Sequence, residues 1–157
     1  MKKYFTKYNN MHKFLLVISG ILIFDQYTKY LIYDYFTSND EIISVMPFLN
    51  FILVWNYGIS FGMLNSITGG QVIFSTLALF IIIILIFWYR KTKNAQLIMP
   101  ISLIIGGAIG NIIDRINYGA VLDFIDVHAF GWHYPAFNIA DAFIVLGAII
   151  CFSIKKI

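Results

Sequence analysis

The chain has 157 residues and a mean hydropathy of +0.80, and 60% of its residues are hydrophobic whereas only 12% are charged. Soluble domains carry about a quarter of their residues as charged side chains, so this composition excludes most soluble proteins and points to a membrane. It also excludes disordered, collagen-like and nucleic-acid-binding chains, which need more charge or more Gly and Pro. The net charge of +3 is therefore no sign of a nucleic-acid partner, and we expect none.

Four segments are apolar enough to cross a membrane, for which about 20 mainly apolar residues are needed. They run over about 14–36, 71–89, 95–113 and 137–154. We expect the first to remain as an uncleaved helix, because no small-x-small cleavage site follows its apolar run. Four crossings place both termini on one side. The pattern predicts a membrane all-α fold with four transmembrane helices in a single integral-membrane domain, 1–157.

The basic residues indicate which side of the membrane holds the termini. Nine of the eleven precede the first span, join the second to the third, or follow the fourth, and the positive-inside rule makes that face cytoplasmic. The eight carboxylates fall toward the opposite face, where Lys29 and Arg115 accompany them. These acids are Asp25, Asp34, Asp40, Glu41, Asp114, Asp123, Asp126 and Asp141.

The two outer loops differ in composition. The first, about 37–70, contains two runs rich in β-branched and aromatic residues, 42–45 and 48–55, which are typical of strands. After them, 58–64 is apolar enough to lie on the membrane surface. The second, about 117–136, is short and aromatic, and we expect a loop at interfacial depth.

Ionisable residues inside a span are costly, so each is a candidate functional residue whose partner should be named. Asp25 and Lys29 are four residues apart on one helical face and can form an ion pair. A structural salt bridge and a role in positioning a substrate are equally open for that pair. Near the end of the third span Asn111, Asp114 and Arg115 share one face. Asp114 with Arg115 is interpreted first as a structural ion pair.

Two further carboxylates are candidates for catalysis. Asp123 lies among apolar residues, which oppose ionisation, and Asp141 lies one turn into the fourth helix, where Asn138 is expected to act as the N-cap. Two carboxylates a few ångströms apart share a proton, so one can act as a base on water while the other acts as an acid. The pair favours peptide hydrolysis without a metal. Cys151, far from every acid, is expected to pack in the core.

Two other chemistries compete with this interpretation. Ser60 with Lys29 could form a hydroxyl nucleophile and an amine base. A proton-coupled transporter could also use intramembrane acids, although these acids gather at one face and form no chain across the bilayer. A metal site at Asp126, His128 and His133 is disfavoured, because these residues have no metal-binding spacing.

Five ordered stretches carry a more specific signal. They are 25–29 (DQYTK), 56–62 (NYGISFG), 107–115 (GAIGNIIDR), 121–126 (VLDFID) and 137–141 (FNIAD). Together with the four spans, they resemble the lipoprotein signal peptidases, or signal peptidase II, a family of small bacterial membrane aspartyl proteases. Ile59 departs mildly from the alanine of many members and puts no catalytic role in doubt.

The resemblance implies roles for individual residues. Asp123 and Asp141 would form the catalytic dyad. Supporting or substrate-binding roles would fall to Asp25, Lys29, Asn56, Gly58, Asn111, Asp114, Arg115 and Asn138. The first outer loop would form a small extracytoplasmic β-sheet that cradles the substrate, and 58–64 a short surface helix.

The resemblance also implies the substrate and the setting. The substrate would be a prolipoprotein with a diacylglyceryl group on its lipobox cysteine, cut at the peptide bond just before that cysteine. Neither a metal nor a cofactor is expected. The expected partners are this substrate and membrane lipid, and the enzyme is expected to be a monomer. It would lie in the bacterial cytoplasmic (inner) membrane, with its active site toward the extracytoplasmic face.

Overall fold

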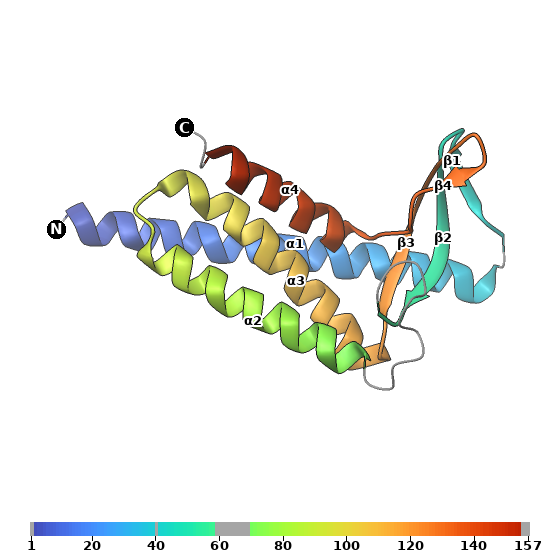
Figure 1. The fold of residues 1–157 in the computed structure, drawn as a ribbon, viewed down its shortest axis with the longest axis horizontal. Helices are drawn as coiled ribbons and strands as arrows, with labels where there is room; N and C mark the ends of the chain where they lie inside the picture. The colour runs from blue at the N-terminus through green and yellow to red at the C-terminus, as the bar shows by residue number, and fades with distance from the viewer. Residues whose placement is uncertain (1, 40, 59–69, 155–157) are drawn as a thin grey trace.

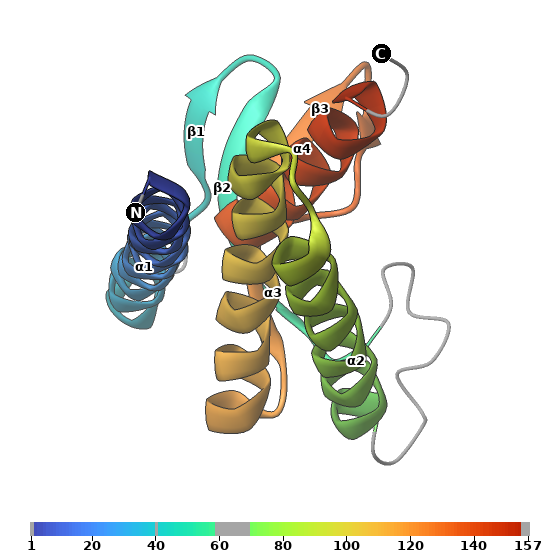
Figure 2. The same ribbon diagram turned by 90° about the vertical axis from the view of Figure 1, so that its left-hand side faces the viewer.

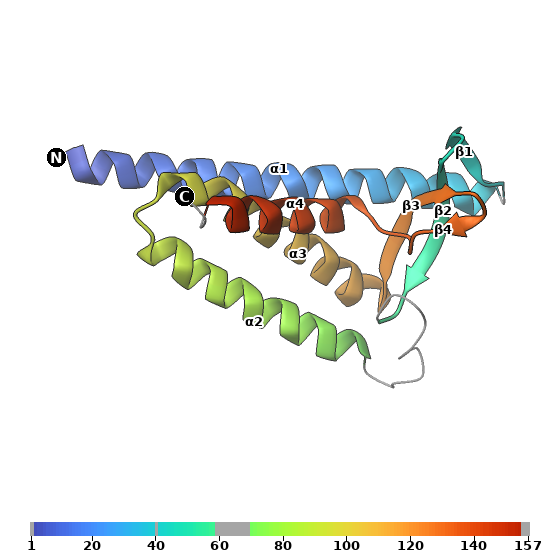
Figure 3. The ribbon, with the colours of Figure 1, turned by 45° about the horizontal axis from the view of Figure 1, so that its top comes forward.

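Four helices run along the long axis of the molecule, and a small sheet closes one end of their bundle (Figures 1 and 3). The computed structural model describes residues 2–39, 41–58 and 70–154, with side chains from Met11 onward. The helices are α1 (Lys2–Ser38), α2 (Gly70–Lys91), α3 (Ile98–Tyr118) and α4 (Ile139–Ile154), and the 3-10 turn η1 (Ala95–Leu97) precedes α3.

The spans predicted from the sequence correspond to these helices. In the described parts of the chain, three segments are long and apolar enough to cross a membrane: Met11–Ser38, Gly70–Lys91 and Ala95–Tyr118. α4 is also apolar, but its 16 residues extend only about 24 Å at 1.5 Å per residue. The third helix continues past the predicted end at 113, and the fourth begins at Ile139.

α3 is the central helix, in contact with α1, α2 and α4 (Figure 2). Glycines allow two of these contacts to be close. A Cβ on Gly106 would lie 3.1 Å from the Ile21 side chain of α1, and a Cβ on Gly107 would meet the Ala140 backbone oxygen of α4. α3 ends at Gly119, whose φ of 71° lies in the left-handed region that glycine adopts readily.

The sheet is antiparallel, with the strand order β1-β2-β3-β4. Its strands are β1 (Ile43–Met46), β2 (Leu49–Asn56), β3 (Val121–Ala129) and β4 (Trp132–His133). β1 and β2 confirm the two strands predicted in the first outer loop. The prediction of a loop over 117–136 was wrong, because β3 pairs with β2 along most of its length. The surface helix predicted at 58–64 lies outside the described residues, apart from Gly58.

Two apolar clusters hold these elements together. One lies between the helices and includes Phe14, Ile101 and Ile105. Cys151 is buried in it, in agreement with its predicted packing role. The other places Leu122 and Phe124 of β3 against Ile32 of α1. β3 is therefore fixed across the ends of the helices, and its first residues lie beside α3 and α4.

Candidate active site

Asp123 and Asp141 come from different elements and share one asparagine partner. Asp123 lies on β3 and is only 2% exposed, whereas Asp141 lies in the first turn of α4 and is half-buried. Asn138 donates from Nδ2 to Asp123 Oδ1 at 2.7 Å, and its backbone N–H donates to Asp141 Oδ2 at 3.3 Å. The two carboxylates are close enough for the charge of Asp141 to act on Asp123.

Asn138 is the N-cap predicted for the fourth helix. Its Oδ1 accepts the backbone N–H of Asp141 at 2.9 Å, and Asp141 reaches back to the Asn138 N–H. This reciprocal pair is a capping box. Because Oδ1 accepts that N–H, the amide must present Nδ2 to Asp123. The same residue therefore starts α4 and orients both carboxylates.

Two more asparagines orient the carboxylates from the other sides. Asn56, at the end of β2, accepts the Gly58 N–H on Oδ1 and donates from Nδ2 to Asp123 Oδ2 at 2.9 Å. Asn111 of α3 donates from Nδ2 to Asp141 Oδ1 at 2.7 Å. An asparagine amide donates only from its nitrogen. Because another group donates to the oxygen of each amide, the nitrogen is the atom that faces the carboxylate.

A buried charge centre holds Asn111 in this orientation. Lys29 Nζ donates to Asn111 Oδ1 at 3.2 Å and lies 2.8 Å from a carboxylate oxygen of both Asp25 and Asp114. All three charged side chains are at most 5% exposed. The Asp25–Lys29 ion pair predicted from their spacing is confirmed, and Asp114 completes it from α3.

This charge centre also holds the two segments that carry the candidate catalytic carboxylates. Asp25 Oδ1 accepts the backbone N–H of Ala140, next to Asp141, at 2.9 Å. Asp114 Oδ2 accepts the backbone N–H of Leu122, next to Asp123, at 3.3 Å. The ion-paired residues therefore act on the site through the backbone as well as through Asn111.

The ion pair predicted between Asp114 and Arg115 does not form. Neighbouring residues on a helix point in different directions, and Asp114 is turned toward Lys29. The half-buried Arg115 donates to the backbone oxygen of Asn111 at 3.4 Å, and its guanidinium lies 5.9 Å from the centre of the Phe74 ring. Its charge still acts on the carboxylates of the site.

The protonation of Asp123 follows from its surroundings. Burial, and after it the negative charge of Asp141, raises the pKa of Asp123 from its ordinary value to about 7. The hydrogen bonds from Asn56 and Asn138 and the charge of Lys29 oppose this rise. The raised pKa favours the protonated form of Asp123, as its apolar setting in the sequence predicts.

One contributor was missed by sequence reasoning. Gln26 Nε2 donates to Asp114 Oδ1 at 2.9 Å and to Asp25 Oδ2 at 3.2 Å, so it bridges the two acids that hold Lys29. The signal in the sequence was a polar amide directly beside the ionisable Asp25 within a membrane span. Every site residue predicted from the sequence lies in or beside this hydrogen-bonded cluster.

The structure bears on one of the alternative chemistries, the metal site. Ser60 lies outside the described residues. Asp126 accepts hydrogen bonds from Asn50 and pairs with His133 Nδ1 at 2.8 Å, while His128 stacks on His133. Within the described part of the chain, no three His, Cys, Asp or Glu side chains are arranged to hold a metal ion.

Comparison with known proteins identifies the family. The family model described as signal peptidase (SPase) II matches residues 17–155. The chain belongs to the signal peptidase II family. Family membership, together with the apolar helices, makes this chain a membrane protease, and it confirms the resemblance seen in the five sequence stretches.

Similar proteins cover nearly the whole chain. The lipoprotein signal peptidase of Janthinobacterium sp. (strain Marseille) is 42% identical over 155 residues, which is 95% of this chain and 91% of that protein. The lipoprotein signal peptidase of Anaplasma phagocytophilum (strain HZ) is 39% identical over 136 residues, 87% of this chain and 86% of that protein. A solved bacterial membrane enzyme, at 1.9 Å resolution, has a TM-score of 0.80 and 34% identity, with 92% of each chain covered.

Proposed function

We propose that this chain is an aspartyl endopeptidase that removes signal peptides from diacylglyceryl-modified prolipoproteins by cutting before the lipidated cysteine. The observation that carries the proposal is the arrangement of Asp123 and Asp141, two carboxylates from separate elements bound to one asparagine. The relatives named lipoprotein signal peptidase support the substrate class.

The proposed chemistry uses one proton shared by the two carboxylates. Asp141, ionised, takes a proton from a water molecule whose oxygen attacks the scissile carbonyl carbon, while Asp123 gives its proton to the carbonyl oxygen. In the tetrahedral intermediate, Asp141 returns its proton to the amide nitrogen as the C–N bond breaks. Asp123 recovers a proton from a hydroxyl group of the intermediate, so the pair ends as it began.

The proposal includes an orientation in the bacterial cytoplasmic membrane. All four helices cross it, with both termini on the cytoplasmic side and the sheet on the other. Two observations support this. α1 begins and α4 ends at the end of the bundle away from the sheet (Figure 3), and the sequence places nine of its eleven basic residues toward that end. Since one chain supplies both carboxylates, a monomer suffices.

The serine-type alternative is disfavoured by the state of Lys29. Its Nζ lies 2.8 Å from two buried carboxylates and donates to Asn111 Oδ1, so its donors are already bound within the buried charge centre. The transporter alternative is disfavoured by membership of a peptidase family.

The proposal is tested by cleavage of a diacylglyceryl-modified precursor by the purified full chain. Asp123→Asn should lower the rate at least about a thousandfold, because it removes half of an acid–base pair. Ser60→Ala should keep most of the activity, and the same precursor without its diacylglyceryl group should be cut poorly.

Asp126→Asn is the matched control, since Asp126 lies on the same strand but bonds Asn50 and His133. It should remain active. Normal turnover by Asp123→Asn, or complete loss in Ser60→Ala, would overturn the aspartyl assignment.

A further inference from the structure

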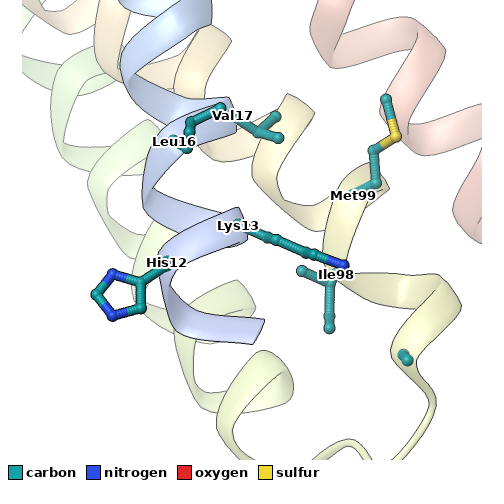
Figure 4. A pocket seen from close by; sticks show the side chains of 7 residues that line it. His12, Lys13, Leu16, Val17, Ile98 and Met99 are labelled. Atoms are coloured by element: carbon teal, nitrogen blue, oxygen red, sulfur yellow. The ribbon is translucent and has the colours of Figure 1, made fainter. Parts of the chain in front are cut away.

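A groove lies at the end of the bundle away from the sheet, between α1 and the start of α3 (Figure 4). Its volume is about 500 Å³. It is lined by His12, Lys13, Leu16, Val17, Ala95, Ile98 and Met99. None of these residues belongs to the candidate active site, which lies at the sheet end of the helices.

The walls of the groove are apolar along their length and cationic at one position. Leu16 is 73% exposed and Met99 is 59% exposed, although both are apolar. The Lys13 side chain extends across the groove, and its ammonium lies beside Ile98, whereas the His12 ring points away (Figure 4). The groove therefore offers one charge next to an uncovered apolar surface.

The apolar part of the groove extends further along α1. Gly20 lies one to two turns beyond Lys13 and Leu16, on the same helical face. A Cβ on Gly20 would meet no atom within 4 Å, so the space over this turn is open. An unbranched chain could run from Lys13 over Leu16 and Gly20 toward the middle of the bundle.

No carboxylate of the described residues neutralises Lys13. Among the residues that the structure describes, it forms no ion pair. The first carboxylate along the chain is Asp25, which lies about 18 Å away along the helix. Arg90 and Lys91, in the last turn of α2, and Lys93, in the loop before η1, add positive charge at this end of the bundle. The charge and the shape together fit an acidic head group attached to an acyl chain.

We propose that this groove binds one anionic phospholipid, with its phosphate on the Lys13 ammonium and an acyl chain along Leu16 and Gly20, against Ile98 and Met99. A lipid fits better than a second protein, because the single charge matches its head group and the open apolar path matches its acyl chain. The inference is independent of the proposed peptide cleavage and uses none of the residues assigned to it.

The proposal is tested by native mass spectrometry of the full chain in detergent, titrated with dioleoyl phosphatidylglycerol and, separately, with dioleoyl phosphatidylcholine. Lys13→Gln should weaken phosphatidylglycerol binding about fivefold, which is the effect of one cation near a lipid surface. Lys93→Gln is the matched control, because it removes an exposed charge at the same end outside the groove. It should change binding less than twofold.

Gly20→Leu separates a lipid from a free phosphate. It keeps every charge and fills the apolar path, so it should also weaken phosphatidylglycerol binding, and soluble glycerol phosphate should not compete. Equal losses in Lys13→Gln and Lys93→Gln would overturn the proposal in favour of general charge attraction. Unchanged binding in Gly20→Leu with competition by glycerol phosphate would overturn it in favour of a free-phosphate site.

Discussion

Three asparagine amides fix the two site carboxylates, and each amide is itself held at its other end. Asn138 is held by the first turn of α4, Asn56 by the Gly58 N–H and Asn111 by Lys29. Amides suit this task because they carry a donor and an acceptor side without a charge. The carboxylates are therefore held by uncharged donors, which in the proposed mechanism leave one proton for the two carboxylates to share.

The hydrogen bond from Asn56 predicts a specific effect on the pH dependence of cleavage. Above its pKa of about 7, Asp123 loses the proton that it must donate, so kcat/KM should fall as pH rises through 7. Asn56 favours the ionised form of Asp123. Asn56→Ala should therefore raise the pKa and move the falling limb of the pH profile about one unit higher.

Asn50→Ala is the control for that measurement, because Asn50 lies on the same strand and bonds Asp126 instead. Its pH profile should match that of the unmodified chain. A limb that stays in place in Asn56→Ala, or shifts to lower pH, would contradict the role given to this hydrogen bond.

Lys29 is predicted to stabilise the fold by pairing with two buried acids. Lys29→Met would leave Asp25 and Asp114 unpaired and should lower the free energy of unfolding by about 3–5 kcal/mol. The double variant Lys29→Met with Asp114→Asn restores the net charge of the centre and should recover part of this loss. Unfolding in mixed micelles measures the free energy of unfolding of both variants. A double variant that is less stable than Lys29→Met alone would refute this account.

The residue types of the site were predictable, but their pairing was only partly so. Asp25 and Lys29 share one helix, and their four-residue spacing sufficed to predict the pair. The partner of Asp114 lies on another helix, so the nearest charge in the sequence, Arg115, was chosen wrongly. The orientation of the Asn111 side chain could not be predicted from the sequence either, because it depends on contacts with Lys29 of α1 and with Asn138 at the start of α4.

At the scale of elements, the distance between α3 and α4 sets the position of Asp141. A Cβ on Gly107 would meet the backbone oxygen of Ala140, the residue before Asp141. Gly107→Ala should push the first turn of α4 away and lower kcat/KM about a hundredfold, which is the effect of a displacement near 1 Å. Gly20→Ala is the control, since a Cβ there meets nothing within 4 Å.

This prediction is checked by cleavage assays on both variants after their folding in detergent is verified. Gly20→Ala should keep normal activity. If folded Gly107→Ala cleaves as fast as the unmodified chain, close packing of α3 on α4 does not position the site.

Elements set by local composition were predicted well, and those set by long-range pairing were not. The helices follow from apolar runs that must satisfy their own backbone hydrogen bonds in a membrane. β3 was missed because its aromatic and β-branched residues, bounded by Gly119 and Gly131, were interpreted as an interfacial loop. Its pairing with β2 joins segments about 70 residues apart, and such pairing has little local signal.

At the scale of the whole molecule, basic and acidic residues are separated along the axis of the helix bundle. Apart from Lys29 and Arg115, the described basic residues lie at the end where α1 begins, and the acids of the site lie at the sheet end. The sequence predicted this separation because few charges are tolerated in spans. It could not predict that the sheet would cover the helix ends, since that depends on Leu122 and Phe124 packing against α1.

The central claim is that Asp123 and Asp141 act as one catalytic unit. It is tested most directly by single-turnover cleavage of a diacylglyceryl-modified precursor with Asp123→Asn, Asp141→Asn and the double variant. Because two members of one acid–base pair act together, each single variant should lose nearly as much rate as the double variant. If the rate loss of the double variant equals the product of the two single losses, or if either single variant retains substantial cleavage, the claim is contradicted.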